Sequence, residues 1–232
     1  MSEVVFRISV GGGFLLAFLI YLLLRRFRNF ETAIMWVVGT ALLIEKIVEY
    51  ILTPLLPTEL SHWSYLLLGL AIMLRLRFLY FGAGSLGLLS AFGYFLGVMV
   101  FPPMFLQTMS TPIVIRGIIT HSLLLLLSLH CLFSAKKVTL LDMVFPLVFT
   151  AALVVFNYLL MNDKVVLPGW NPSGKALVMI LDGTLLQYIV KDYPGWAVPI
   201  MQVTIGVVFV AVVFALNRLS RRFCEDYRRY LI

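Results

Sequence analysis

Side chains of the kinds used for acid–base and nucleophilic chemistry occur inside strongly apolar stretches of this sequence. The hydroxyl of Ser64 is a weak nucleophile by itself, and a histidine such as His121 could act as its base in an attack on an ester. Arg116 could contact a phosphate or stabilise an oxyanion. Glu45 and Glu49 lie four residues apart and share one helix face, where they could orient the other groups or shuttle protons.

Three further polar residues complete the candidate binding set: His62, Asn157 and Tyr158. All of these residues also have a structural interpretation, as a buried ion-pair network, a hydrogen-bonded core histidine and a helix-packing serine. The sequence contains no Gly-x-Ser-x-Gly, Walker, His-Glu-x-x-His or Cys-x-x-Cys pattern. The three histidines are scattered, so neither a metal site nor a cofactor is expected.

The composition explains which elements must position these residues. Of the 232 residues, 62% are hydrophobic and 12% are charged, and the mean hydropathy is +1.02. Soluble domains contain about 45–50% apolar and about 25% charged residues. The apolar runs are continuous and roughly 20 residues long, which suits membrane-spanning helices and does not suit a β-barrel. We therefore expect an all-α, polytopic transmembrane bundle, a single transmembrane domain over residues 1–232, located in the cell membrane.

The apolar runs predict seven spans, at 4–24, 32–54, 61–80, 84–103, 111–134, 138–161 and 197–217. Basic residues follow the first, fifth and seventh spans, and Arg75 and Arg77 close the third, whereas the opposite loops "LPTEL" and "PPMFLQTMS" contain none. The excess of basic residues marks the cytoplasmic side. The amino terminus is therefore expected outside and the carboxyl terminus inside, with a basic cytoplasmic tail at 218–232. The outer loop 162–196 contains a short apolar stretch, which we expect to be interfacial or re-entrant.

With this orientation, the candidate site residues fall at a similar depth, between the bilayer centre and roughly 12 Å outward of it. Ionisable groups at such depths are costly and usually face the bundle interior. The arrangement predicts a polar cavity in the outer half. The cytoplasmic halves hold few comparable groups, and His130 and Asp142 lie near their ends.

The expected partners are membrane lipids. The net charge of +7 does not indicate nucleic acid, because the basic residues lie in loops beside hydrophobic spans, where they act as topology determinants and contact anionic lipids. Glycines allow close helix approach within the bundle or in a homo- or hetero-oligomer, and they cluster at Gly11, Gly12, Gly13, Gly82, Gly84, Gly87, Gly93 and Gly97.

The order of several short motifs resembles a known family. These motifs are "LSHWSYLLLGLAIML", "AFGYFLGVMVFPP", "RGIITHSLLLLLSLH" and "NYLL", and in order and content they are similar to the YwaF-like family of bacterial integral membrane proteins. That family is similar to the transmembrane protein 164 acyltransferases and, more distantly, to intramembrane lipid hydrolases of the androgen-induced type. The resemblance covers roughly residues 32–200.

The resemblance implies that a nucleophile and a histidine on separate spans act on lipid esters. His121 matches the family histidine, and Asn157 with Tyr158 matches the "NY" before the outer loop. Where the family has His-x-Cys, this chain has His62-Trp63-Ser64. Serine would then replace the nucleophilic cysteine and would need stronger activation by its base.

Three functions remain open on the sequence alone. The first is hydrolysis or acyl transfer on lipid esters, with His121 as base and Ser64 as nucleophile. The second is a proton-coupled transporter or channel that uses Glu45, Arg116 and His121, although the sparse cytoplasmic halves weigh against it. The third is a non-catalytic membrane scaffold or subunit, in which the ion pairs are structural.

Overall fold

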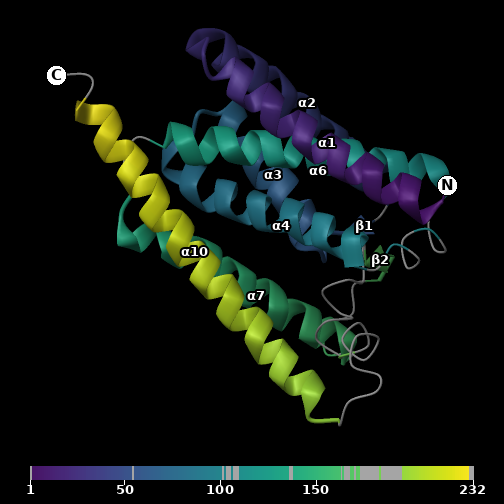
Figure 1. The fold of residues 1–232 in the computed structure, drawn as a ribbon. Coiled ribbons are helices and arrows are strands. Elements are labelled where there is room, and N and C mark those ends of the chain that lie inside the picture. Colours follow the sequence, from purple (N-terminus) through teal and green to yellow (C-terminus); the bar gives the residue numbers. More distant parts are fainter. Residues whose placement is uncertain are drawn as a thin grey trace. The chain divides into compact units, whose positions relative to one another are not determined.

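The computed structural model describes residues 2–53, 55–100, 102, 106, 110–135, 138–162, 164, 168–169, 171–172, 183 and 195–229. Most of these residues are helical (Figure 1). Two short strands, β1 (Leu55–Leu56) and β2 (Asn171–Pro172), pair in parallel. The predicted interfacial or re-entrant segment of loop 162–196 lies almost wholly outside the described residues.

Each predicted apolar run overlaps one helix, which confirms the all-helical class. The helices are α1 (Glu3–Leu24), α2 (Arg28–Leu52), α3 (Leu60–Met73), α4 (Tyr80–Val100), α6 (Thr111–Ser134), α7 (Val144–Met161) and α10 (Ala197–Arg229). Two 3-10 turns, η1 (Arg77–Leu79) and η2 (Leu140–Met143), precede α4 and α7. The predicted basic tail is helical up to Arg229, where α10 ends.

Five helical segments are long and apolar enough to cross a membrane: Glu3–Leu24, Arg77–Val100, Thr111–Ser134, Leu140–Leu160 and Ala197–Arg222. The other two predicted spans differ from these. α2 has 25 residues but carries five charged side chains. α3 has 14 residues and is about 21 Å long, shorter than the bilayer core of about 30 Å. Seven spans and their orientation stay predictions.

The third predicted span, 61–80, is not one continuous helix. α3 ends at Met73 in a Schellman motif, in which the amide of Leu76 donates to the carbonyl of Ala71 and the amide of Arg75 to that of Ile72. Arg75 adopts a φ of 55°, the left-handed conformation that reverses the chain at a helix end. The chain therefore turns here before η1 and α4.

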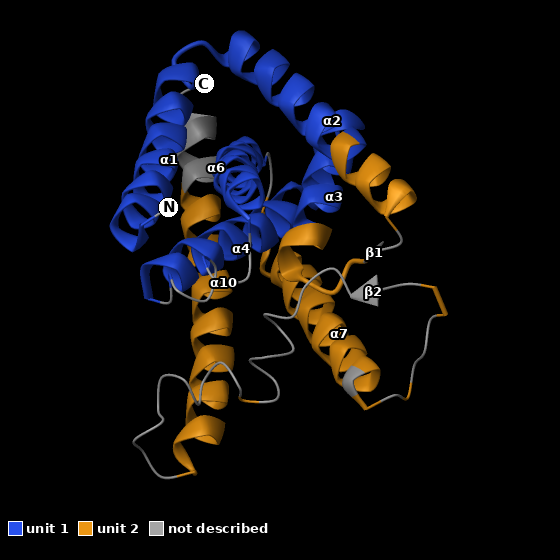
Figure 2. Ribbon diagram, turned by 90° about the vertical axis from the view of Figure 1, so that its right-hand side faces the viewer, with its two compact units in different colours: residues 1–44, 64–135 blue, residues 45–63, 136–232 orange. Residues whose placement is uncertain are grey.

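Two compact units divide the chain (Figure 2): Met1–Ile44 with Ser64–Ala135, and Glu45–Trp63 with Lys136–Ile232. We call them unit 1 and unit 2. In unit 1, α4 and α6 pack closely along their length, and both contact α1. In unit 2, α7 packs against η2 and α10. The amide of Asn217 in α10 donates to the carbonyl of Thr139 at 2.7 Å, which ties α10 to the start of η2.

Glycines permit the close helix contacts of unit 1, as their clustering predicts. A Cβ built on Gly84 would lie 2.9 Å from Leu132 Cγ, and one on Gly13 would lie 3.0 Å from Ser122 Oγ. A Cβ on Gly87 would collide with Ser128. By contrast, Gly12 and Gly93 have no neighbour within 4 Å of that position. Three of the predicted glycines therefore serve helix packing inside this unit.

Candidate functional site

The predicted site residues divide between the two units. Unit 1 contains three of them, Ser64, Arg116 and His121. Unit 2 contains the other five: Glu45, Glu49, His62, Asn157 and Tyr158. Each set is built by its own helices and has its own chemistry.

His121 lies near the middle of α6, with its ring anchored to the same helix. Its Nδ1 lies 2.9 Å from the carbonyl oxygen of Gly117, one turn earlier. A carbonyl oxygen can only accept a hydrogen bond, so the hydrogen of the neutral ring belongs on Nδ1. The lone pair then belongs to Nε2, as in a histidine that acts as a general base.

Two tyrosines from other helices fix the plane of this imidazole. Tyr94 of α4 stacks on it with ring centroids 3.9 Å apart and an interplanar angle of 12°. Tyr65 of α3, almost fully buried, meets it edge-on at 5.9 Å, and its hydroxyl lies 3.3 Å from Nδ1. Three helices of unit 1 therefore converge on His121. Side chains held in this way can present a nitrogen in one fixed direction.

The glycine beside His121 is part of the same arrangement. A Cβ on Gly117 would lie 3.0 Å from the hydroxyl oxygen of Tyr94. The absence of a side chain at this position lets Tyr94 lie flat along α6 and reach the imidazole. The hydroxyl of Thr120 donates to the carbonyls of Arg116 at 2.9 Å and of Gly117 at 3.3 Å, and so stays within α6.

Ser64 is fully buried within unit 1, in the second turn of α3. The contact that the structure describes between α3 and His121 is made by the adjacent residue, Tyr65. Ser64 and His121 therefore belong to neighbouring helices of one unit, joined through that tyrosine. A direct reaction between Ser64 and His121 stays a prediction.

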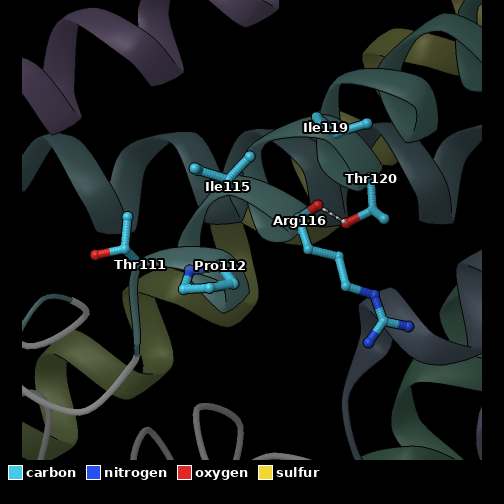
Figure 3. A pocket seen from close by; sticks show the side chains of 6 residues that line it. All are labelled: Thr111, Pro112, Ile115, Arg116, Ile119 and Thr120. Carbon is cyan, nitrogen blue, oxygen red and sulfur yellow. Dashed lines mark hydrogen bonds between the residues drawn. The ribbon is translucent and has the colours of Figure 1, made fainter.

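Arg116 is exposed and borders an open groove along one face of α6 (Figure 3). The groove encloses about 490 Å³. Its described lining consists of Thr111, Pro112, Ile115, Arg116, Ile119 and Thr120. Ile115 and Ile119 point to one side in this view, and the guanidinium of Arg116 extends away from the helix. The surface of the groove is apolar, and the guanidinium lies to the other side of α6 from Ile115 and Ile119 in this view.

In unit 2 the predicted carboxylates flank a buried lysine. Lys46 Nζ lies 2.8 Å from Glu49 Oε2 and 3.6 Å from Glu45 Oε2, and Lys46 is 5% exposed. The two glutamates share one face of α2, as their spacing predicts, and the lysine between them binds both. A buried ammonium needs such partners, because an unpaired charge in a low-dielectric interior is unstable.

The remaining residues of unit 2 have diverse surroundings. The ring of His62 meets that of Tyr50 edge-on at 5.9 Å. Asn157 is fully buried, and its amide donates to the carbonyls of Thr58 at 3.0 Å and Leu153 at 2.8 Å. This bond fastens α7 to the segment before α3, which is a structural role. Tyr158 is 58% exposed.

Sequence reasoning missed one polar pair in unit 1. His130 Nδ1 of α6 lies 2.8 Å from Glu31 Oε1 of α2, and both side chains are nearly inaccessible. The ring of Tyr80 lies beside His130, with centroids 6.3 Å apart. Glu31 and His130 are an acid and a base near the same predicted membrane boundary, and this was the only sequence feature that could have indicated their contact. Tyr65, Tyr94 and Gly117 were missed because neutral residues do not stand out in an apolar sequence.

Comparison with known proteins identifies no relative. No family model, no curated protein and no solved structure matches the chain. Among the described residues, no group of three or more His, Cys, Asp or Glu side chains could hold a metal ion.

Proposed function

We propose that this chain is an integral membrane protein that acts on lipid esters, by hydrolysis or acyl transfer. The observation that carries the proposal is the set of contacts that hold the His121 ring. Its Nδ1 faces the carbonyl of Gly117, and its ring is held between Tyr65 and Tyr94. That arrangement supports a neutral imidazole with a basic Nε2 in an apolar bundle.

In the proposed reaction, Ser64 Oγ attacks the acyl carbonyl carbon while its proton passes to Nε2 of His121. The tetrahedral intermediate collapses, the bond to the leaving alcohol breaks, and His121 returns the proton to that oxygen. Water then attacks the acyl-serine in hydrolysis, or an acceptor alcohol does so in transfer. His121 takes the proton of that nucleophile, and Ser64 is regenerated.

The groove beside Arg116 supports a lipid as the substrate. The guanidinium could bind the phosphate of a phospholipid through two parallel hydrogen bonds. The strip formed by Ile115 and Ile119 could lie along an acyl chain, and both residues are about half exposed. Five residues separate Arg116 from His121, a rise of about 7.5 Å along α6. An ester close to the headgroup would lie at a comparable distance from its phosphate.

We further propose seven spans, with the amino terminus outside and the carboxyl terminus inside. The site would then open toward the outer leaflet of the cell membrane. Glu45 and Glu49 would orient groups or shuttle protons within unit 2, where their contacts with Lys46 hold the side chains in place. His62, Asn157 and Tyr158 belong to unit 2, and their part in substrate binding stays a prediction.

Covalent labelling tests the enzyme proposal. The purified chain in phosphatidylcholine liposomes is treated with a lipid-like fluorophosphonate, which modifies activated serines. We expect labelling of the wild-type chain and its loss in Ser64→Ala and His121→Gln. Tyr65→Phe removes only the hydroxyl near Nδ1 and should lower the labelling rate without abolishing it.

A matched control separates chemistry from folding. Ser85 is fully buried in α4 of unit 1, and its hydroxyl has no hydrogen-bond partner in the described part of the chain. Ser85→Ala should therefore keep full labelling. Absence of labelling in a folded wild-type chain, or equal labelling of Ser64→Ala, would refute the catalytic role and favour a scaffold.

A proton-coupled transporter is the second candidate, and the Glu31–His130 pair favours it. A buried acid–base pair within apolar helices is typical of proton pathways. This pair adds polar groups to the predicted cytoplasmic halves, which contain few ionisable residues. A pH-sensitive dye inside proteoliposomes measures proton flux. Flux in the wild type that is lost in Glu31→Gln or Glu45→Gln would support transport, and equal acidification of protein-free liposomes would exclude it.

A further inference from the structure

One end of unit 1 carries a concentration of exposed arginines. The connection between α1 and α2, the start of α4 and the end of α6 all lie on the left in Figure 1. Five exposed arginines occupy this end, and we call them the arginine rim: Arg25, Arg26, Arg28, Arg75 and Arg77. The rim joins two loops that are about fifty residues apart in sequence.

The charge at the rim is not balanced within unit 1. This unit contains seven arginines, no lysine and two glutamates, Glu3 and Glu31. Glu3 lies at the start of α1, far along the helix from the rim. Glu31 is 4% exposed and faces His130. Within unit 1 the rim therefore carries a net positive charge.

The guanidinium of Arg25 is held in place by two aromatic residues. Its Nη1 donates to the hydroxyl of Tyr21 at 2.6 Å, and its guanidinium lies 4.7 Å from the ring centroid of Phe133. One hydrogen bond uses one of five guanidinium N–H groups. A guanidinium stacked on an aromatic ring loses little freedom on binding, so it is suited to a planar, two-oxygen contact with phosphate.

Large aromatic side chains are interspersed among the arginines. Phe27, Phe30 and Phe78 are 61%, 59% and 73% exposed. In water such exposure is unfavourable, but at the boundary between headgroups and acyl chains the rings enter hydrocarbon while the arginines remain among the phosphates. The alternation of phenylalanine and arginine therefore fits a membrane interface better than an aqueous partner.

The backbone at Arg75 gives an independent indication. Arg75 occupies the left-handed position of a Schellman motif, where glycine is the favoured residue because it has no Cβ. An arginine adopts this conformation at an energetic cost. Its charge is the property that glycine could not supply.

We propose that the arginine rim binds the phosphate groups of anionic phospholipids and so gathers these lipids around one end of unit 1. The proposal is independent of the ester chemistry at His121. It requires only that unit 1 lies in a bilayer with the rim at the level of the headgroups.

Spin-labelled lipids measure this preference. The full chain is reconstituted in phosphatidylcholine, and electron paramagnetic resonance gives the association of spin-labelled phosphatidylglycerol relative to spin-labelled phosphatidylcholine. Each arginine near an anionic surface contributes about a fivefold preference. We expect a clear preference for phosphatidylglycerol, reduced about fivefold in Arg75→Gly and again in Arg75→Gly with Arg77→Gln. High salt should weaken it.

Two controls make the result decisive. Arg75→Gly removes the steric strain of the left-handed conformation at this position, so a lost preference in this variant cannot be attributed to unfolding. Arg7→Gln removes an exposed arginine at the opposite end of α1 and should leave the preference unchanged. The proposal is wrong if the wild type shows no preference, or if Arg7→Gln reduces it as strongly. It is also wrong if inorganic phosphate displaces the lipid while sodium chloride at the same ionic strength does not, because the site would then bind free phosphate.

Discussion

His121 owes its orientation to neutral neighbours. A glycine carbonyl receives its Nδ1 hydrogen, and a tyrosine ring covers one face at 3.9 Å. Neither of these neighbours carries a charge, so they fix the ring by hydrogen bonding and stacking. The shape of the helix surface at Gly117 is therefore as important as any polar contact.

Gly117→Ala tests that dependence. The new methyl group would lie 3.0 Å from the hydroxyl oxygen of Tyr94, so this side chain must shift by a few tenths of an ångström and its stacking on His121 is disturbed. We expect the fluorophosphonate labelling rate to fall several-fold. The free energy of unfolding should change little, because better helix propensity offsets the crowding.

Gly93→Ala provides the matched control, since no atom lies within 4 Å of the added methyl group. It should raise the stability of α4 by about 0.5–1 kcal/mol and leave labelling unchanged. Equal labelling of Gly117→Ala and the wild type would contradict the role of Tyr94 stacking.

The Glu31–His130 pair should show strong energetic coupling. Replacing His130 alone with leucine leaves the Glu31 carboxyl group buried without its hydrogen-bond partner, at a cost of about 1–3 kcal/mol. Replacing both residues with leucine removes both buried polar groups, so the double variant should lose much less than the sum of the single losses. Unfolding by SDS titration in mixed micelles measures each free energy. Additive losses would mean that the two side chains do not interact.

At the scale of elements, α2 and α3 each have residues in both units. α3 supplies both Ser64 and Tyr65. Its packing against α2 in unit 1 is tight, since a Cβ on Gly69 would lie 2.6 Å from Leu43 Cβ. The indole of Trp36 donates to the carbonyl of Met73 at 3.1 Å, which holds the end of α3 against α2.

The helix end itself can be tested through Arg75. Arg75→Gly should stabilise the chain by about 1 kcal/mol, because glycine adopts a φ of 55° without a steric penalty. Arg75→Ala keeps the Cβ and should bring no such gain. Unfolding in SDS micelles distinguishes these outcomes. Equal stability of both variants would show that the left-handed turn at this position is not strained.

At the scale of the whole molecule, the orientation in the membrane is the main prediction. We expect Ser110 outside and Arg26 inside. In a Cys224→Ser background, a membrane-impermeant maleimide added to intact cells should label Ser110→Cys and spare Arg26→Cys. Cys131 is buried and should not react. Labelling of both positions from outside, or of Arg26→Cys alone, would overturn the topology.

The sequence by itself determined the helical class and most of the helix positions. In lipid, the backbone polar groups of a continuous apolar run must form hydrogen bonds within their own segment, and a helix provides these bonds. The predicted span 111–134 coincides with α6. The end of α3 was placed too late: Arg75 and Arg77 interrupt the apolar run directly after Met73, but the predicted span continued to residue 80.

Only the tertiary structure decided which polar residues meet. Sequence spacing placed Glu45 and Glu49 on one face of α2, because spacing within a helix is fixed by its pitch. It could not join Glu31 to His130 or Tyr65 and Tyr94 to His121, since those contacts depend on how helices cross. Helix crossings follow from close packing at small residues such as Gly13 and Gly84, and that information is distributed over several helices.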